Sequence, residues 1–162
     1  MHPRAAELIA TLQLEPHPEG GYFREVFRSP SRVVTADGRG VRVAATSIYF
    51  LLAQGSLSRW HRVRSDEIWH LYEGGPLELL EIDSSITRLT SARLGAIGDG
   101  AAAPVHTVVA GNWQAARPLG DYVLVGCTVA PGFVYDDFLL LADDPTLAAV
   151  VTTAWPDAAS LI

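Results

Sequence analysis

His61 and Glu67 have the residue types and spacing of an acid–base pair. Both lie in segment 55–74, GSLSRWHRVRSDEIWHLYEG, which is typical of two strands joined by a turn at residues 64–66. Side chains alternate between the faces of a strand, so the two groups converge if these strands form a hairpin. An imidazole titrates nearest to neutral pH, which makes His61 the best candidate for proton transfer, with Glu67 orienting it or sharing the work.

A purely structural role for the same two residues is the alternative. Burying a histidine and a carboxylate is costly unless the groups pair or serve a site. A buried polar pair without chemistry meets that requirement as well as an active site does. We favour the functional interpretation, because pockets lined by such pairs are where perturbed pKa values collect.

Short strands separated by turn residues are predicted for nearly all of residues 20–142. About ten strands punctuated by Gly and Pro are typical of an all-β sandwich or barrel. Apolar residues at helical spacing predict a short helix over residues 3–14. A second short helix is predicted over residues 143–149, with Asp143 or Asp144 as its N-cap. The length of 162 residues predicts a single domain, 1–162, with its barrel core at about 20–142.

The net charge of −6 and the isoelectric point near 5.2 exclude classes of function that need a basic surface. Nucleic-acid binding requires cations that neutralise phosphates, and anionic membranes attract basic segments. No apolar run approaches the roughly 20 residues that span a bilayer. The N-terminus lacks the features of a signal peptide, so we expect a cytoplasmic protein with a small-molecule partner. Cys127, the single cysteine, lies in an apolar run and is predicted to be a buried strand residue.

Segment 55–74 resembles the first motif of the cupin superfamily, G(X)5HXH(X)3E(X)6G. Four positions of that motif are matched in register: Gly55, His61, Glu67 and Gly74. Segment 109–114, VAGNWQ, is similar to the second cupin motif, PXGXXH, with Gln114 in place of the histidine. The two motifs together predict a cupin barrel.

Four segments further resemble the DUF985 (cupin_5) branch: EGGYFRE at 19–25, HRVRSDEIWHLYEG at 61–74, AGNWQ at 110–114 and APGFVYDDF at 130–138. This resemblance implies an all-β double-stranded β-helix, the jelly-roll barrel of the cupins, with a shape similar to the RmlC-type sugar-nucleotide epimerases. It also implies a homodimer, which the apolar surplus of the strand segments SIYFLLA and DYVLVGCTVA favours independently. The activity of the branch is generally unassigned, so the resemblance indicates fold better than function.

The same motif positions bear on metal binding. Metal-dependent cupins hold their ion with three histidines and one glutamate, whereas this chain has His61, Val63, Glu67 and Gln114 at those positions. Only two good ligands are left, although Gln114 could add a carbonyl oxygen. We expect no cofactor, and the alternative is a weakly bound divalent ion held by His61, Glu67 and Gln114.

Further residues are predicted to bind the substrate. Arg59 lies on the same strand face as His61, and Arg24 shares a face with Tyr22, so each arginine could hold an anionic group; a surface or interface ion pair is the alternative. Trp69 lies on the face of Glu67 and would provide a wall for stacking, with a purely core role as the alternative. The set is completed by residues beside the second motif and in GFVYDDF: Gln114, Phe133 and Asp136. His70 lies on the opposite face from Glu67 and is predicted to be a subunit-interface or core residue.

Three functions are consistent with these residues. The leading hypothesis is a metal-independent isomerase, epimerase or lyase that uses His61 to move a proton on a small polar or anionic substrate. The second is a metal-dependent dioxygenase or isomerase that uses His61, Glu67 and Gln114. The third is a binding module without catalysis, which senses a sugar or a small acid.

Overall fold

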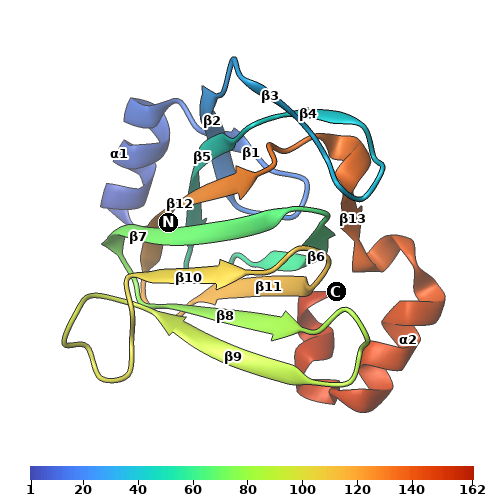
Figure 1. Cartoon of the computed structure of the whole chain (residues 1–162). Coiled ribbons are helices and arrows are strands. Elements are labelled where there is room, and N and C mark those ends of the chain that lie inside the picture. Colours follow the sequence, from blue (N-terminus) through green and yellow to red (C-terminus); the bar gives the residue numbers. More distant parts are fainter.

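Two antiparallel sheets face each other across the interior of the molecule in the computed structural model, which describes residues 1–162 (Figure 1). Six strands form the first sheet, five form the second, and two more form a separate hairpin. This arrangement confirms the predicted all-β jelly-roll barrel with a short N-terminal helix. The chain has thirteen strands where about ten were expected, because one expected segment, 41–53, forms two strands and short strands at 15–16 and 32–34 are added.

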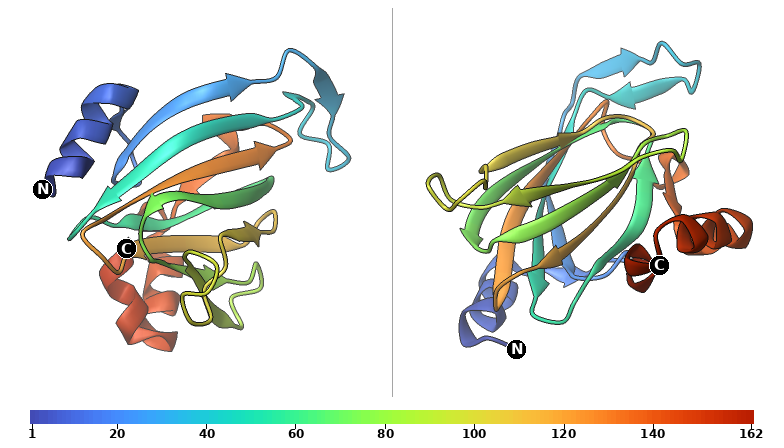
Figure 2. Two further views of the ribbon diagram at one scale, coloured as in Figure 1. Left: turned by 90° about the vertical axis from the view of Figure 1, so that its left-hand side faces the viewer. Right: turned by 90° about the horizontal axis from the view of Figure 1, so that it is seen from below.

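The six-stranded sheet has the spatial order β1 (Glu15–Pro16), β2 (Tyr22–Arg28), β5 (Thr46–Ala53), β12 (Tyr122–Ala130), β7 (Asp66–Gly74) and β10 (Val105–Val108). The five-stranded sheet has the order β13 (Phe138–Leu140), β6 (Ser58–Val63), β11 (Trp113–Pro118), β8 (Leu77–Ile82) and β9 (Leu89–Leu94). The separate hairpin pairs β3 (Arg32–Val34) with β4 (Val41–Val43) and projects beyond the barrel (Figure 2).

Apolar side chains from the inner faces of both sheets form the main core. Phe50, Val123 and Val125 come from the six-stranded sheet, and Leu77 and Leu79 come from the five-stranded sheet. All of these side chains are almost completely buried. The alternation of inward apolar residues along each strand therefore explains how the two sheets pack.

Helices cover parts of the outer faces of both sheets. The helix α1 (Pro3–Leu12) packs its buried residues Ala5 and Leu8 on the outside of the six-stranded sheet. The helix α2 (Pro145–Ala154) and the 3-10 segment η3 (Pro156–Leu161) cover the outer face of the five-stranded sheet (Figure 1). Asp144 caps α2 by accepting a hydrogen bond from the backbone N–H of Leu147, one of the two caps predicted, and the helix extends five residues beyond the expected end at 149.

The expected hairpin between His61 and Glu67 is wrong. β6 belongs to the five-stranded sheet and β7 to the six-stranded sheet, so the two strands are not hydrogen-bonded to each other. Arg64 and Ser65 instead carry the chain around a corner from one sheet to the other. His61 and Glu67 nevertheless both face the interior, from opposite sides of the barrel.

A buried ion-pair cluster fastens the β3–β4 hairpin to the segment before β13. Asp137 ends the 3-10 turn η1 (Tyr135–Asp137) and is buried. Arg39 Nη1 donates to Asp137 Oδ2 at 2.9 Å, and Arg42 donates to both oxygens of the carboxylate at 2.7 and 2.9 Å. These hydrogen bonds, the larger contribution coming from Arg42, lower the pKa of Asp137. We call this group the Asp137 clamp.

Part of the outer face of the six-stranded sheet is uncovered. His70 pairs with Gly126 and is partly exposed, and Tyr72 on the same face is 53% exposed. The homodimer, with His70 at its interface or in a core, stays a prediction. Neither of the α-helices has the length and apolar character required to cross a bilayer.

Candidate functional site

A cavity of about 400 Å³ lies between the two sheets, and its lining includes Arg28 and Thr46, the residues at which the chain leaves for and returns from the β3–β4 hairpin. Its walls come from β2, β5, β6, β7 and β12, and from the segment 133–138. The apolar part of the wall includes four aromatic rings, namely those of Phe23, Phe133, Tyr135 and Phe138. Five ionisable side chains line the deeper part: His17, Glu19, His61, Glu67 and Cys127. We call this set the polar floor.

The imidazole of His61 has a fixed orientation. Its Nδ1 lies 2.7 Å from the carbonyl oxygen of Arg59, and because a carbonyl only accepts, Nδ1 carries the hydrogen. In neutral His61 the lone pair is therefore on Nε2, which lies 3.3 Å from Glu19 Oε2. The ring of Phe138 stacks against the imidazole, with centroids 5.5 Å apart. His61 can thus exchange a proton only through Nε2.

Glu19 is the partner of His61, and the sequence analysis did not identify it. The loop that carries Glu19 is fastened to the start of β6, because Arg59 N donates to Glu19 O at 2.8 Å and Ser58 Oγ donates to Glu19 Oε1 at 2.8 Å. Gly20 allows this close approach: it has a φ of +110°, and a Cβ there would lie 2.1 Å from Leu57 O. The loop therefore inserts a carboxyl group into the barrel from outside the regular strands.

His17 lies on the other side of Glu19. The backbone N–H of Glu19 donates to His17 Nδ1 at 3.3 Å, so in the neutral ring Nε2 carries the hydrogen. The side chain is only 7% exposed, and its ring makes an edge contact with Phe23 at 4.5 Å between centroids. No group of the chain accepts a hydrogen bond from His17 Nε2.

Glu67 is held by two residues behind it. Gln114 Nε2 donates to Glu67 Oε2 at 2.6 Å, and Trp69 Nε1 donates to Gln114 Oε1 at 2.9 Å. An indole N–H can only donate, so Trp69 determines which end of the Gln114 amide faces Glu67. The other carboxylate oxygen, Glu67 Oε1, receives no hydrogen bond from an N–H or O–H of the chain. The thiol of Cys127 is the remaining group of the chain that interacts with the Glu67 carboxyl.

Burial sets the protonation preferences of the polar floor. Loss of solvation raises the pKa values of Glu19 and Glu67, because a charged carboxylate is disfavoured away from water. The same effect lowers the pKa values of His17 and His61, for which the cation is the charged form. Burial also raises the pKa of Cys127 well above its ordinary range, so its thiol is neutral and is not an activated nucleophile. The environment thus favours neutral forms in all five groups.

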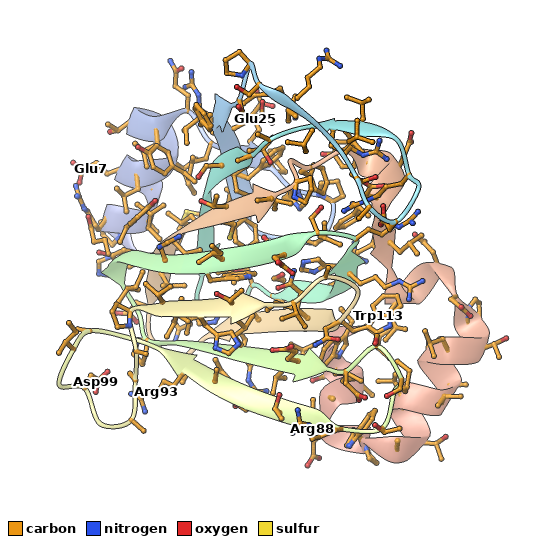
Figure 3. The ribbon with its side chains drawn as sticks, viewed as in Figure 1. Glu7, Glu25, Arg88, Arg93, Asp99 and Trp113 are labelled. Atoms are coloured by element: carbon orange, nitrogen blue, oxygen red, sulfur yellow. The ribbon has the colours of Figure 1, made fainter.

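An ion pair stands at the exposed part of the cavity wall. Arg28 donates to both oxygens of Glu25, at 2.9 and 2.6 Å, and its Nη1 donates to the carbonyl oxygen of Phe133 at 3.3 Å. Glu25 lies on β2, as Figure 3 shows. The guanidinium of Arg28 is therefore engaged on all three nitrogens.

Six of the seven predicted substrate-binding residues lie outside the cavity lining, and for four of these six the structure shows a position or contact unrelated to Glu67. Tyr22 packs with α1 on the outer face of the sheet, and Arg24 donates to Leu12 O and Gln13 Oε1 on that face. Arg59 donates to Pro18 O and so fastens the loop that carries Glu19. Asp136 is exposed on η1.

The other predicted residues lie at or directly behind the cavity. His61, Glu67 and Phe133 line it, whereas Trp69 and Gln114 hold Glu67 from behind. The prediction missed Glu19 because the segment HPEGG reads as a turn. Two consecutive glycines after a glutamate were the signal that the backbone approaches another strand closely.

A double-sheet jelly-roll barrel with a cavity between its sheets is an architecture found in the cupins. The model of the Cupin_5 family, described as cupin superfamily (DUF985), matches residues 6–141. The chain belongs to this family.

Two solved structures are similar over nearly their whole length. A hypothetical protein from Leishmania major is 33% identical, with a TM-score of 0.83 and coverage of 98% of this chain and 96% of that one. A protein from Shewanella oneidensis is 32% identical, with a TM-score of 0.82 and coverage of 97% and 93%. A variant of oxalate decarboxylase from Bacillus subtilis is 17% identical, with a TM-score of 0.56, over 87% of this chain and 34% of that one, and supports the fold alone. The search of curated proteins gave no match.

The donor groups at the cupin metal positions do not fit a resident ion. Val63 offers no ligand atom, and the carbonyl oxygen of Gln114 is engaged by the Trp69 indole while its amide nitrogen faces Glu67. The available lone pair of neutral His61 is on Nε2, and this nitrogen faces Glu19. No three His, Cys, Asp or Glu side chains are grouped so that they could hold a metal ion. This geometry supports an interpretation of the site in which the side chains themselves act as acid and base.

Proposed function

We propose that this cupin is a metal-independent enzyme, an isomerase, epimerase or lyase, that moves a proton next to a carbonyl group of a small molecule. The observation that carries the proposal is the contact of 3.3 Å between His61 Nε2 and Glu19 Oε2 in a buried cavity. His61 and Glu19 share at most one exchangeable proton along this contact, since His61 Nδ1 is committed to Arg59 O. The pair can therefore act as one base.

The two sides of the cavity support complementary steps. Without the shared proton, the His61–Glu19 pair accepts a proton from the substrate carbon next to the carbonyl. Glu67 approaches from the opposite sheet, and burial raises its pKa, so it can donate a proton to the carbonyl oxygen. The product of these two transfers is an enol. If the enol proton returns to Glu67 and carbon is protonated at a different position or on the other face, the product is an isomer or an epimer. If Glu67 takes back the enol proton while a leaving group on the neighbouring carbon departs with the proton held by the His61–Glu19 pair, the reaction is that of a lyase.

Proton exchange with deuterated water tests this function for any substrate that the cavity accepts. We expect the protein to exchange C–H protons of one or a few compounds in a small-molecule cell extract, followed by proton NMR. His61→Gln and Glu19→Gln should slow that exchange by about 10² to 10⁴-fold, the usual contribution of a positioned acid or base. His106→Gln, outside the cavity, is the matched control and should exchange normally. Equal exchange by His61→Gln and the parent, or no exchange at all, would refute the proposal.

Two alternatives are distinguished by simple measurements. A metal-dependent dioxygenase or isomerase would contain stoichiometric metal after purification without chelator or nickel affinity, and Glu67→Gln would remove that metal. A binding module without catalysis would bind ligand and exchange no protons. The orientation of Gln114 favours the metal-independent enzyme over the first alternative.

The homodimer and the cytoplasmic location stay predictions, as does the similarity in shape to the RmlC-type epimerases. Sedimentation at micromolar concentration should give about twice the chain mass of 17.4 kDa.

A further inference from the structure

We infer that the cavity takes an uncharged carbonyl compound with an apolar or aromatic body, and that it discriminates against carboxylates and phosphates. This inference rests on the proposed function, because it assigns a substrate class to the same site. It departs from the sequence-based expectation that arginines bind an anionic substrate.

The cavity lining has no arginine or lysine side chain that is free to bind an anion. Arg28 is the only arginine in the cavity lining, and the chain contains no lysine. All three guanidinium nitrogens of Arg28 donate to Glu25 or to the carbonyl of Phe133. Arg24 and Arg59 donate to groups outside the cavity. An anion that enters would lose its solvation without gaining a cationic partner.

Two carboxyl groups lie at the depth where the ligand must react. Glu19 and Glu67 are both buried, and the charge of Glu19 acts on Glu67 strongly enough to raise its pKa further. A carboxylate ligand would add a third acid to this space. Burial disfavours every charged form in this space, the ligand's carboxylate included, and wherever Glu19 or Glu67 does ionise its charge repels that ligand, so the polar floor selects against anions.

Two buried groups in the cavity, His17 Nε2 and the Glu67 carboxyl, have hydrogen-bonding capacity that the N–H and O–H groups and the acceptors of the chain leave unused. His17 Nε2 carries a hydrogen in the neutral ring, and the chain provides no acceptor for it. Glu67 Oε1 is also without an N–H or O–H donor, and in the protonated acid it carries the hydrogen because Oε2 accepts from Gln114. Both side chains are more than nine-tenths buried and line the cavity. A carbonyl oxygen is a group that accepts from a donor of either kind.

The remaining wall favours a ring or another apolar body. Phe23, Phe133 and Phe138 contribute aromatic surfaces, and Ile48 and Val129 contribute aliphatic ones. A volume of about 400 Å³ accommodates a molecule of one or two rings. The apolar wall and the two donors together match a neutral carbonyl group on an apolar body.

Benzamide and benzoate test the inference, because they share a shape and differ in charge. Titrations at pH 7.5, followed by calorimetry or protein NMR, should give a Kd for benzamide at least tenfold lower than that for benzoate. Glu25→Gln removes the carboxylate that neutralises Arg28, so benzoate should bind this variant several-fold more tightly than it binds the parent, with benzamide unchanged. Glu78→Gln is the matched control, since Glu78 pairs with Arg117 at 2.6 Å outside the cavity lining, and it should change neither Kd.

Three results would overturn the inference: equal or tighter binding of benzoate by the parent, no binding of either probe at millimolar concentration, or no effect of Glu25→Gln on benzoate. These results are distinct from failure of the proposed function. If benzamide and benzoate bind equally well, the assigned ligand class is wrong, but the comparison of proton exchange between the parent and His61→Gln still tests catalysis. Conversely, absence of proton exchange with the probe preference intact refutes catalysis and retains the ligand class.

Discussion

The two halves of the barrel interior are built by the same strands and have opposite chemistry. β12 contributes Val123 and Val125 to the apolar half and Cys127 to the cavity. β11 likewise buries Ala116 in the main core and directs Gln114 toward Glu67. In these two strands every second residue faces the interior, and only the type of the inward residue changes. A functional site in this fold therefore needs substitutions at the cavity end and no change of topology.

The comparison also separates stability from chemistry. Burial of aliphatic and aromatic side chains in the apolar half stabilises the fold. In the cavity half, buried acids and histidines cost free energy unless hydrogen bonds offset the loss of solvation. We expect substitutions in the apolar half to alter stability without altering binding, and substitutions in the polar floor to alter binding together with the pH dependence of stability.

The largest effect on stability is expected for Leu79→Ala. Leu79 is completely buried in the main core and does not line the cavity. Its truncation should lower the free energy of unfolding by about 2 to 5 kcal/mol, measured by denaturant unfolding. Under conditions where the variant is folded, the Kd for benzamide should equal that of the parent. A large change of Kd would show that the two halves are not separable.

A smaller effect is expected for Trp69→Phe, which lies on the border between the halves. Loss of the indole N–H leaves Gln114 Oε1 without a donor, at a cost of about 1 to 3 kcal/mol, and the Gln114 amide no longer has a fixed orientation toward Glu67. Benzamide binding should weaken several-fold. Trp60→Phe is the matched control, because Trp60 is equally buried and donates to Ala158 O at 2.9 Å outside the cavity. If both variants weaken benzamide binding equally, Trp69 has no specific role in positioning Glu67.

The smallest and sharpest effect is a difference in pH dependence between Glu67→Gln and His61→Gln. The pKa of Glu67 is raised in the folded state, so the parent loses stability as the pH rises from about 4.5 through that raised pKa, and Glu67→Gln should not share this loss. The pKa of His61 is lowered, so the parent loses stability as the pH falls below about 6.5, and His61→Gln should not share that loss.

Unfolding free energies measured from pH 5 to 9 test this pair of predictions. Relative to the parent, Glu67→Gln should gain stability toward high pH and His61→Gln should gain it toward low pH. Parallel curves for both variants and the parent would mean that neither group is buried with a perturbed pKa. A strong loss of stability in each single variant that is recovered in the double variant would identify His61 and Glu67 as a structural pair.

The sequence predicted the barrel well because local signals determine it. Alternating apolar residues and Gly-Pro punctuation indicate short strands, and the cupin motif in segment 55–74 includes His61 and Glu67. Asp144 was recognisable as a cap because it precedes Pro145 at the first turn of a helix.

The parts that the sequence did not predict depend on contacts between distant residues. Nothing in segment 58–67 indicates that β6 and β7 join different sheets, since hairpins and corners have similar turn residues. Arg24 and Arg59 share strand faces with plausible site residues, yet backbone carbonyls and Gln13 engage them outside the cavity. Glu19 reaches the site only through its loop, which no strand pattern describes.

The cavity joins segments from both ends of the barrel sequence. Glu19 precedes the first long strand, whereas the ring of Phe138, in contact with His61, lies after the last one, more than 110 residues away in the chain. Neither end alone forms the cavity, so a ligand that fits it binds the folded chain and has no site in the unfolded one. Mass action then couples occupancy to folding: a ligand at a hundred times its Kd raises the free energy of unfolding by about 2.7 kcal/mol. The melting temperature of the whole protein thereby becomes a sensor for its unidentified substrate.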